Sequence, residues 1–471
     1  MASPFFRIVA LLAAFLFFLP QSSFALTTAE EKELGREFMQ EVRRRYELIQ
    51  DPVILEYVNR VGQRVLEAAG PQPFDYRFYV VRENMYNAFA GPGGHVFIHS
   101  GLLAAMESEE ELAGILAHEV AHVTCRHISE KISRGNKIQM AALAGMVASL
   151  FLGGGAATNA LAAGSIAAGV QASLAYSRRD EMQADEVGLM YLAQAGYSPR
   201  GLQDILEKIR RKNWFGTDQV PGYLSTHPAA EDRSAYIETW IATHPDEPKA
   251  PVPGNDVAFH KVKGRLIALY GSPRSARQFL ARRVEADGKD AAARYALGVF
   301  LMREGHREQA LDHLKAAARL RPFDPDILSE LGRAYLETGK PKDAVAALSG
   351  VREAPENAQV LFYLGRAYLA AGNPAKAESV LKKTLEADPD HLEALNYLGQ
   401  AEGKLKRLAE AHFHLGVYHY RKGDIPNARF HLERALSRVV DAPALERSIR
   451  EILDSLPSRY QTGEAGPRPL F

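Results

Sequence analysis

The sequence predicts a mainly α-helical protein in two parts, an α+β domain with a small sheet followed by an all-α solenoid of repeats. Three observations predict this fold class. Apolar residues between positions 29 and 70 recur at spacings of three and four, which is typical of helices. Aromatic and β-branched runs at 75–82 and 87–99 indicate short strands. Beyond residue 258 a Leu-Gly pair returns about every 34 residues, which indicates stacked helix pairs.

The overall composition is that of a folded globular protein. Its 471 residues are enough for about three domains, and 46% of them are hydrophobic against 24% charged. Basic and acidic residues are equal at 57 each, so the formal net charge is +0. A neutral chain argues against a broad nucleic-acid-binding surface, and we expect no nucleic-acid partner.

The first 25 residues are expected to be an export signal. Arg7 precedes an apolar stretch at 8–19, and Ser23-Phe24-Ala25 supplies the small residues of a cleavage site. The stretch is short for a membrane span of about 20 residues, although an uncleaved anchor is the alternative. We therefore expect a periplasmic protein that is cleaved near Ala25.

The α+β part begins with two predicted helices. The first is predicted from one apolar stripe, formed by Leu34, Phe38, Val42, Tyr46 and Ile49. The second is expected at 52–69, because Gly70-Pro71 ends the pattern. A strand is then predicted at 75–82.

Residues 87–99 are expected to form a strand, a glycine-rich turn and a second strand. An extended substrate could pair main chain to main chain with an exposed strand edge here, and an ordinary internal hairpin is the alternative. The residues of this candidate substrate edge are Asn87, Ala88, Phe89, Ala90, Gly93 and Gly94.

A well-marked helix follows. Ser108 is a good N-cap with Glu111 three positions later, which predicts a capping box. Glu109 and Glu110 favour the positive end of the helix dipole. Most of the remaining residues are apolar, so we expect this helix to be largely buried.

The same helix carries the sequence His-Glu-Val-Ala-His at 118–122. His118 and His122 are four residues apart, so both imidazoles lie on one face and can reach one metal ion. Glu119 lies between them and can take a proton from a water molecule that the ion has made more acidic. The pattern predicts a catalytic zinc site with one Zn²⁺ per chain.

A catalytic zinc ion needs a third protein ligand and an open position. Glu181 and Asp185 are four apart on a predicted helix, and we expect Glu181 to be that ligand. Asp185 would then accept a hydrogen bond from a ligand imidazole and fix its tautomer. The alternative is a solvated acidic face that also includes Asp180 and Glu186.

These motifs together resemble one gluzincin family, which includes the CAAX prenyl proteases and the HtpX heat-shock proteases. The segments that carry the resemblance are Asn87-Ala-Phe-Ala, Gly93-Gly94, His118 to His122, Glu181-Met-Gln-Ala-Asp185 and Ser225-Thr-His-Pro. The resemblance implies a zincin-type metallopeptidase domain in which His118, His122 and Glu181 bind zinc, Glu119 is the base and Asp185 supports the active site.

The resemblance also implies two further residues. It places His227 near the metal, as a reversible fourth ligand that keeps the enzyme latent or as a helper of the transition state. It places Arg233 near the carbonyl of a bound peptide. From the residues alone, a capping or surface histidine and a structural salt-bridge arginine remain alternatives.

Two neighbours of the motif are assigned no role in catalysis. The chain has one cysteine, Cys125, which cannot form an internal disulfide and is expected to be a small buried residue. His127 is five residues from His122 and is expected to point elsewhere.

Residues 140–170 carry no charged side chain. The stretch is rich in Ala and Gly and is interrupted by Gly153-Gly154-Gly155, so we expect two short apolar helices around a turn. They could form a lid over the active site, a peripheral membrane contact or an ordinary buried pair. A transmembrane span is the remaining alternative.

A proline-rich linker at 244–257 is expected to separate the metallopeptidase domain at 26–243 from the repeats at 258–440. The Leu-Gly pairs at 297, 331, 364 and 398, with Gly, Ala and Pro markers in the same register, resemble the tetratricopeptide repeat. The register slips after Leu398, which predicts an irregular last unit before a C-terminal helix and tail at 441–471.

The sequence thus predicts a zinc metalloendopeptidase whose repeats recruit protein clients in a chaperone-like manner. The resemblance implies that these clients are unfolded or misassembled outer-membrane proteins, that the repeats contact the outer-membrane β-barrel assembly machinery, and that the protein acts in quality control of that assembly. Two alternatives stay open. One is a chaperone or adaptor with a latent metal site, and the other is a membrane-embedded protease of the HtpX kind.

Overall fold

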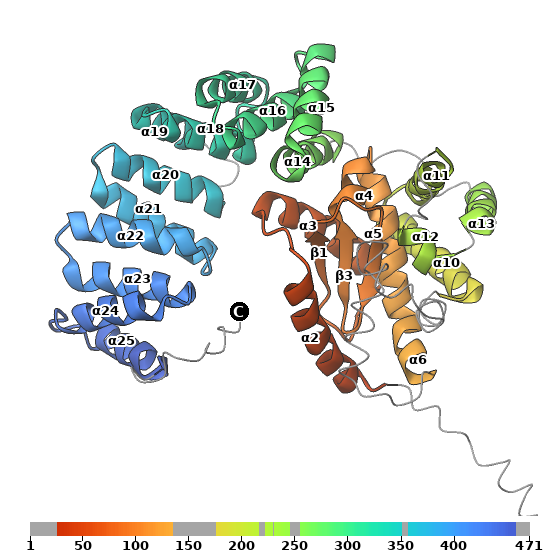
Figure 1. Ribbon diagram of the computed structural model, residues 1–471, viewed down its shortest axis with the longest axis horizontal. Coiled ribbons are helices and arrows are strands. Elements are labelled where there is room, and N and C mark those ends of the chain that lie inside the picture. Colours follow the sequence, from red (N-terminus) through yellow and green to blue (C-terminus); the bar gives the residue numbers. More distant parts are fainter. Residues whose placement is uncertain are drawn as a thin grey trace, which may run out of the picture. The chain divides into compact units, whose positions relative to one another are not determined.

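The computed structural model describes residues 26–134, 176–215, 222–228, 230–244, 255–350 and 357–457 (Figure 1). The predicted signal at 1–25, the apolar segment 140–170 and most of the linker at 244–257 lie outside the described residues. The chain forms two compact units, Met1–Lys263 and Gly264–Phe471. The predicted domain boundaries at 243 and 258 stay predictions.

The first unit is helical around one small sheet. Its elements are α2 (Thr28–Arg45), α3 (Pro52–Ala68), β1 (Arg77–Val81), β2 (Ala88–Gly91), β3 (His95–His99), α4 (Ser100–Ala105), α5 (Glu109–Thr124), α6 (His127–Arg134), α10 (Arg178–Gln194), α11 (Arg200–Phe215), α12 (Gly222–Thr226) and α13 (Ala230–Thr243). None of the described helices is long and apolar enough to cross a membrane.

The predicted first helix is confirmed, but it is shorter than its apolar stripe. All five stripe residues are buried, yet the helix ends at Arg45 and the next residue, Tyr46, is extended. Leu48 then forms a β-bridge with Val81. The last two apolar positions, Tyr46 and Ile49, therefore reach the core from extended backbone.

The sheet has the strand order β1-β3-β2. β1 runs parallel to β3, whereas β2 pairs with β3 in the antiparallel direction, with Phe89 opposite Phe97. Gly93 and Gly94 have φ of +77° and +85° in the turn between them, a conformation that glycine adopts without steric cost. The predicted strand, turn and strand are thus confirmed. Phe89 and Phe97 stack at a centroid distance of 4.7 Å.

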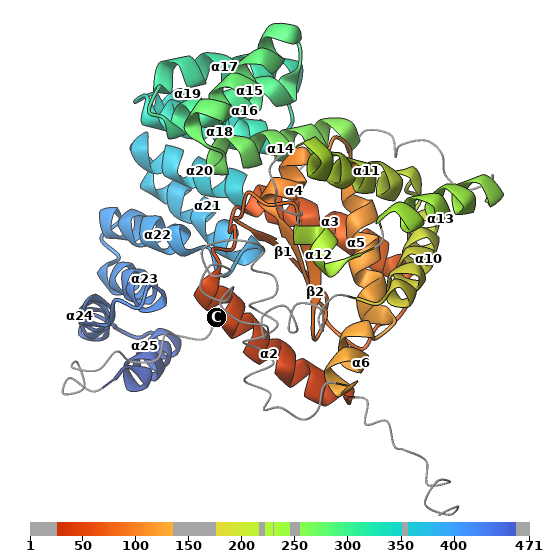
Figure 2. The same cartoon turned by 45° about the vertical axis from the view of Figure 1, so that its right-hand side comes forward.

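Helix α5 lies against β2 and is also packed by α3, α10 and α11 (Figure 2). Its residues from Glu109 to Val123 are all buried, as predicted. Gly188 allows α10 to approach α5 closely, because an added Cβ there would lie 3.3 Å from the carbonyl oxygen of Ala117. α10 can therefore bring its side chains up to the middle of α5.

The predicted capping box of α5 is only half formed. The Ser108 hydroxyl accepts a hydrogen bond from the Glu111 backbone N–H at 3.3 Å. The Glu111 carboxylate does not return to Ser108, because it accepts from the Glu107 backbone N–H and from Lys208 instead. Lys208 on α11 thus binds the Glu111 carboxylate, which the local sequence pattern had assigned to the cap.

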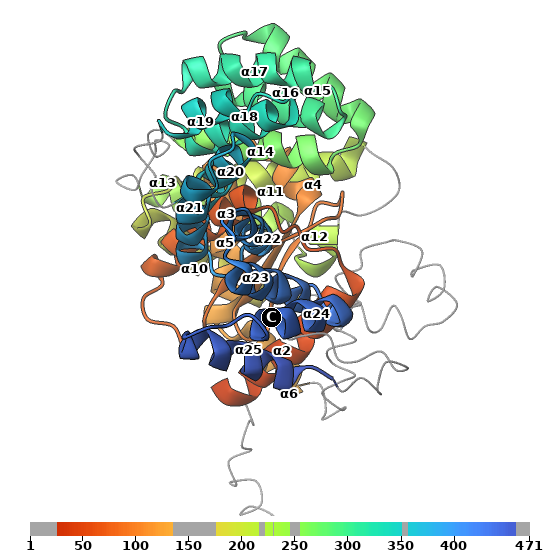
Figure 3. The ribbon, with the colours of Figure 1, turned by 90° about the vertical axis from the view of Figure 1, so that its left-hand side faces the viewer.

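The second unit is a stack of helices that follow one another in chain order (Figure 3). They begin with α14, which crosses the boundary between the units. The helices are α14 (Asn255–Tyr270), α15 (Pro273–Ala286), α16 (Ala291–Arg303), α17 (Arg307–Leu320), α18 (Pro325–Glu337), α19 (Pro341–Leu348), α20 (Ala358–Ala370), α21 (Pro374–Ala387), α22 (Leu392–Lys404), α23 (Leu408–Arg421), α24 (Ile425–Leu436) and α25 (Pro443–Ser455).

The Leu-Gly repeat marks where paired helices touch. A Cβ added to Gly365 would lie 2.6 Å from the Cγ of Leu381, sixteen residues further on. The other pairs with this spacing are Gly298–Leu314, Gly332–Leu348, Gly399–Leu415 and Gly416–Leu432. The last two explain the slip in register, because α23 packs as the second helix of one pair and as the first of the next.

Candidate metal centre

Helix α5 supplies two imidazole side chains whose Nε2 atoms lie next to each other. His118 and His122 are fully buried, and their Nε2 atoms lie 3.0 Å apart. One helical turn separates the two residues, so the pairing follows from the backbone alone.

Helix α10 adds a carboxylate. The Oε1 of Glu181 lies 3.4 Å from the Nε2 of His122, and its Oε2 lies 3.6 Å from the Nε2 of His118. Glu181 is itself fully buried. The structure therefore brings the predicted third ligand to the two histidines.

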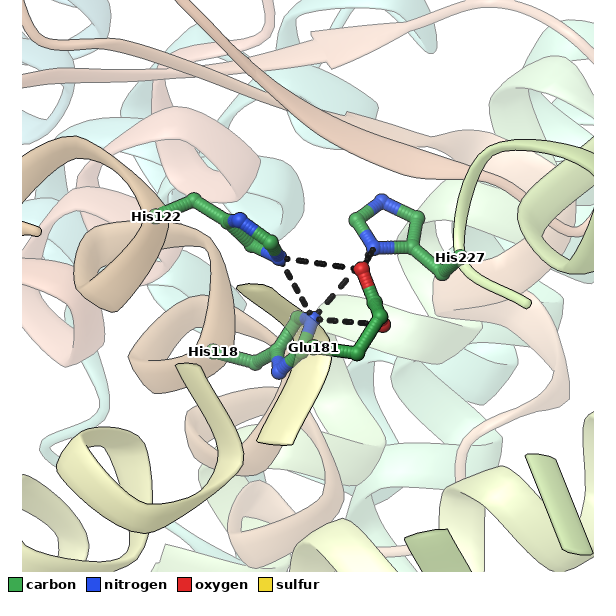
Figure 4. Close-up of side chains that lie close together, drawn as sticks. All are labelled: His118, His122, Glu181 and His227. Carbon is green, nitrogen blue, oxygen red and sulfur yellow. Dashed lines mark hydrogen bonds and ion pairs between the residues drawn. The ribbon is translucent and has the colours of Figure 1, made fainter. Parts of the chain in front are cut away.

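His227, directly after α12, completes the cluster (Figure 4). Its Nδ1 lies 3.3 Å from the Nε2 of His118 and 3.0 Å from the Oε1 of Glu181. The four residues offer ligand atoms that all lie within 4.8 Å of one another. The ring of His227 stacks on Tyr223 at a centroid distance of 4.4 Å, so the side chain is held in this position.

The spacing of these atoms fits a tetrahedral metal ion. Metal–ligand bonds of about 2.0–2.1 Å at tetrahedral angles separate the ligand atoms by about 3.3 Å. The shorter distances between ligand atoms here run from 3.0 to 3.6 Å, and all four atoms lie within 4.8 Å of one another. The Nε2 of His118 faces three such atoms but can donate only one proton, so hydrogen bonds alone do not satisfy the cluster. A bound cation would.

Glu119 is fully buried, and among the described residues neither of its carboxylate oxygens has a hydrogen-bond partner. Its Oε1 lies 3.6 Å from the Nε2 of His227. Burial raises the pKa of Glu119. A buried carboxylate without a hydrogen bond is costly for stability, which favours a functional reason for Glu119 over a structural one.

Asp185 and Arg233 form a charged layer behind the cluster. The Oδ1 of Asp185 lies 2.9 Å from the Nδ1 of His118, and its two oxygens accept from the Nε and Nη2 of Arg233 at 2.7 and 2.8 Å. The Nη1 of Arg233 lies 2.8 Å from the Oε2 of Glu181, but off the line that a hydrogen bond needs. Arg233 is 1% exposed, so this charge is paired inside the protein.

These contacts set the charge states of the site. Burial by itself would raise the pKa of both Glu181 and Asp185. For Glu181 the facing His227 and Arg233 outweigh burial, and for Asp185 Arg233 and His118 do, so both pKa values lie below their ordinary range. Burial lowers the pKa of His122 well below its usual value. Neutral imidazole and ionised carboxylate are the forms that bind a metal ion.

Three neighbours of the cluster were not foreseen. Tyr176 stacks on His122 at a centroid distance of 3.8 Å, and Tyr223 stacks on His227. His127 was expected to point elsewhere, and this was wrong, because its Nδ1 lies 3.0 Å from the Nδ1 of His122. A third His five residues after the motif was the available signal for this contact.

The remaining predicted residues lie apart from the cluster. Cys125 is only partly buried, at the C-cap of α5, and is not one of the clustered residues. Strand β2 is at one edge of the sheet next to α5, and all four of its residues are buried. The role of β2 as a substrate edge stays a prediction.

The buried helix with two imidazoles, the carboxylate from a second helix and the buried Glu119 beside them define a metallopeptidase. Residues 55–241 match the family described as peptidase family M48. Residues 301–354, 329–391 and 362–411 match tetratricopeptide repeat families. The chain therefore contains a family M48 peptidase domain followed by tetratricopeptide repeats.

The chain is also similar to curated proteins that are named as proteases. The chain is 26% identical over 363 residues to the beta-barrel assembly-enhancing protease of Escherichia coli, an alignment that covers 69% of this chain and 73% of the relative. It is 28% identical over 249 residues to the protein of the same name in Yersinia pestis, and this alignment covers 52% of this chain and 50% of the relative. It is 33% identical over 186 residues to the mitochondrial metalloendopeptidase OMA1 of Schizosaccharomyces pombe, and this alignment covers 39% of this chain and 52% of the relative. The chain thus spans about half the length of several relatives that it matches.

Proposed function

We propose that the protein is a zinc-dependent endopeptidase of the periplasm that removes unfolded or misassembled outer-membrane proteins. One observation carries the catalytic part, namely the fully buried carboxylate of Glu119, which has no hydrogen bond from any residue that the structure describes and lies beside four converging ligand atoms. A purely structural metal site would not need this residue.

The chemistry divides between the ion and the chain. A bound zinc ion supplies Lewis acidity, which polarises a peptide carbonyl and makes a water molecule more acidic. His118, His122 and Glu181 would hold the ion. Glu119 would take a proton from the attacking water and pass it to the amine that leaves. Its raised pKa suits a group that must both accept and donate that proton.

Zinc is favoured over other divalent ions by the donor set. Two imidazoles, one carboxylate and a further imidazole in a tetrahedral arrangement are typical of zinc, whereas calcium and magnesium prefer oxygen ligands. Metal analysis of the purified protein tests this choice directly. A content of one zinc per chain is expected, and a protein purified with magnesium or calcium alone would contradict it.

We further infer that this arrangement is a latent state. A catalytic zinc site keeps one position open for substrate, and His227 lies where that position would be. His227 must therefore leave before a peptide can bind. The variant His227→Ala is expected to keep its metal through the other three ligands and to cleave faster. Unchanged or slower cleavage with the metal retained would count against latency.

The substrate class rests on the second unit and on the relatives. Stacked tetratricopeptide repeats present large surfaces for binding proteins. The relatives named beta-barrel assembly-enhancing protease refer in their names to the assembly of β-barrels. We infer that the repeats bring clients or the β-barrel assembly machinery to the peptidase unit. The predicted export signal supports a periplasmic location.

A chaperone or adaptor with a silent metal site is the second candidate, and the closure of the site by His227 favours it. Casein digestion separates the two. Wild-type and His227→Ala proteins are compared with and without a chelator, next to Glu119→Gln and the exposed-site control Glu186→Gln. The endopeptidase proposal expects loss of activity with the chelator and in Glu119→Gln only. Full activity in Glu119→Gln would remove Glu119 as the base.

A further inference from the structure

We propose that His127 is a positioning residue for the metal site, which accepts a hydrogen bond from the outer nitrogen of His122 and so presents its inner nitrogen to the ion. The inference rests on the proposed metal site and deepens it, because it assigns a partner to the second ligand histidine.

The geometry of the pair requires one proton between the two rings. The Nδ1 of His127 and the Nδ1 of His122 lie 3.0 Å apart, and the rings meet edge to face with centroids 5.0 Å apart. His122 is fully buried and His127 is 5% exposed. Both side chains are therefore shielded from water, and one Nδ1 must donate to the other.

The next contact decides which ring donates. The Nε2 of His127 lies 3.2 Å from the Oε1 of Gln183 on α10. A carbonyl oxygen can only accept, so in the neutral ring the Nε2 of His127 carries a hydrogen and its Nδ1 holds a lone pair. His122 must then donate from its Nδ1. In the neutral ring this leaves a lone pair on the Nε2 of His122, which is the atom that faces Glu181 and His118.

The arrangement mirrors the one at the first ligand. The Nδ1 of His118 faces the Oδ1 of Asp185 at 2.9 Å. Each ligand histidine of α5 thus has its outer nitrogen tied to a partner, a carboxylate in one case and His127 in the other. Such partners fix the tautomer and the ring orientation of metal-binding histidines.

The backbone between the two histidines is bent to make the contact. In a continuous helix, residue 127 would point about 140° away from His122, since five residues advance the helix by about 500°. The chain instead leaves α5 at Cys125, and Arg126 adopts a left-handed conformation with φ of 60°. This conformation is unfavourable for a residue with a side chain.

Arg126 is held in that conformation by its own side chain. Its Nη2 lies within hydrogen-bond distance of the backbone oxygen of Leu26 at 2.7 Å, of Glu31 at 2.9 Å and of the hydroxyl of Ser129 at 3.1 Å, and its two hydrogens are shared among these acceptors. The bend returns the chain so that His127, the first residue of α6, lies behind His122. A strained residue that is fixed by several contacts and places a side chain against a metal ligand supports a functional reason for the bend.

The test measures metal binding in the full-length protein by competition with a chromogenic chelator for Zn²⁺, and records the absorption spectrum of the Co²⁺-substituted form. In His127→Leu the zinc affinity is expected to fall by about 10–100-fold and the cobalt spectrum to change. In His127→Asn it is expected to return to within a few-fold of wild type, because the Oδ1 of asparagine can replace the Nδ1 of histidine as the acceptor.

A second variant tests the direction of the proton chain. Gln183 is exposed, so Gln183→Glu is expected to fold normally. A carboxylate at this position accepts from the Nε2 of His127 at least as well as an amide oxygen, so the zinc affinity should equal or exceed that of wild type. A loss in Gln183→Glu as large as in His127→Leu would overturn the assigned tautomer.

The outcomes separate this inference from the proposed function. Wild-type affinity in His127→Leu, or a loss that His127→Asn does not restore, would overturn the positioning role even if the metal site is real. Zinc binding that survives His122→Ala unchanged would instead overturn the proposed metal site, and the positioning role with it.

Discussion

The ion pair of Asp185 with Arg233 behind the metal site leads to a specific prediction for the variant Asp185→Asn. Asp185 is fully buried and holds both the Nδ1 of His118 and two nitrogens of Arg233. Asparagine keeps one acceptor oxygen but replaces the other with an amide that faces a guanidinium. The remaining carboxylate near Arg233 is then Glu181, whose Oε2 lies 2.8 Å from its Nη1.

The magnitude follows from the burial of that charge. Removing one partner of a buried ion pair costs about 3–5 kcal/mol, and the remaining contact of Arg233 with Glu181 favours the lower end, about 3 kcal/mol. A loss of this size corresponds to a fall in melting temperature of about 6–12 °C for a domain of about 150–250 residues. The zinc affinity is expected to fall by about 10–100-fold as well, because the ring of His118 loses its fixed orientation.

Urea unfolding of the metal-free protein measures the first effect, and chelator competition measures the second. Glu186→Gln is the matched control, since it removes a carboxylate from the next position of α10, where the side chain is exposed. The double variant Asp185→Asn/Arg233→Gln should lose less than the sum of the single variants, because the unpaired charge is gone. An Asp185→Asn protein as stable as Glu186→Gln would refute the reasoning.

Three further predictions concern the metal and the repeats. Stripping the metal should lower the melting temperature of the peptidase unit, since an ion at 1,000 times its dissociation constant contributes about 4 kcal/mol; an unchanged melting curve would speak against a bound ion. In the repeat unit Glu330 pairs with Arg265 and Arg333 at 2.7 Å each, and these guanidinium groups outweigh burial and lower the pKa of Glu330. Urea unfolding should therefore show Glu330→Gln less stable than wild type by about 3–5 kcal/mol at pH 7. The difference should shrink as the pH falls below the unfolded pKa of about 4.3, and a constant difference would contradict the ion pairs as its cause. Gly365→Val should destabilise the repeats by at least about 1–3 kcal/mol, because its side chain would overlap Leu381, and thermal unfolding with no change would show that the two helices can separate without cost.

The repeat period could be predicted from the sequence because it reflects local contact. Each glycine meets the leucine sixteen residues later, across one helix pair. The slip after Leu398 was visible too, but the sequence did not show that α23 belongs to two pairs at once. That sharing depends on which faces of α22 and α24 are covered, which is a property of the stack.

The sequence by itself determined the pairing of His118 with His122, the strand and turn segments of the sheet and the register of the repeats. All of these depend on spacings within a few residues of one backbone, where helix and strand periodicity leave little choice. The tertiary structure decided which distant groups meet. It brought Glu181 and His227 to the two histidines, tied Arg233 to Asp185 and folded His127 back behind His122. These contacts arise where separate helices pack against α5, and that packing depends on close approaches such as the one at Gly188.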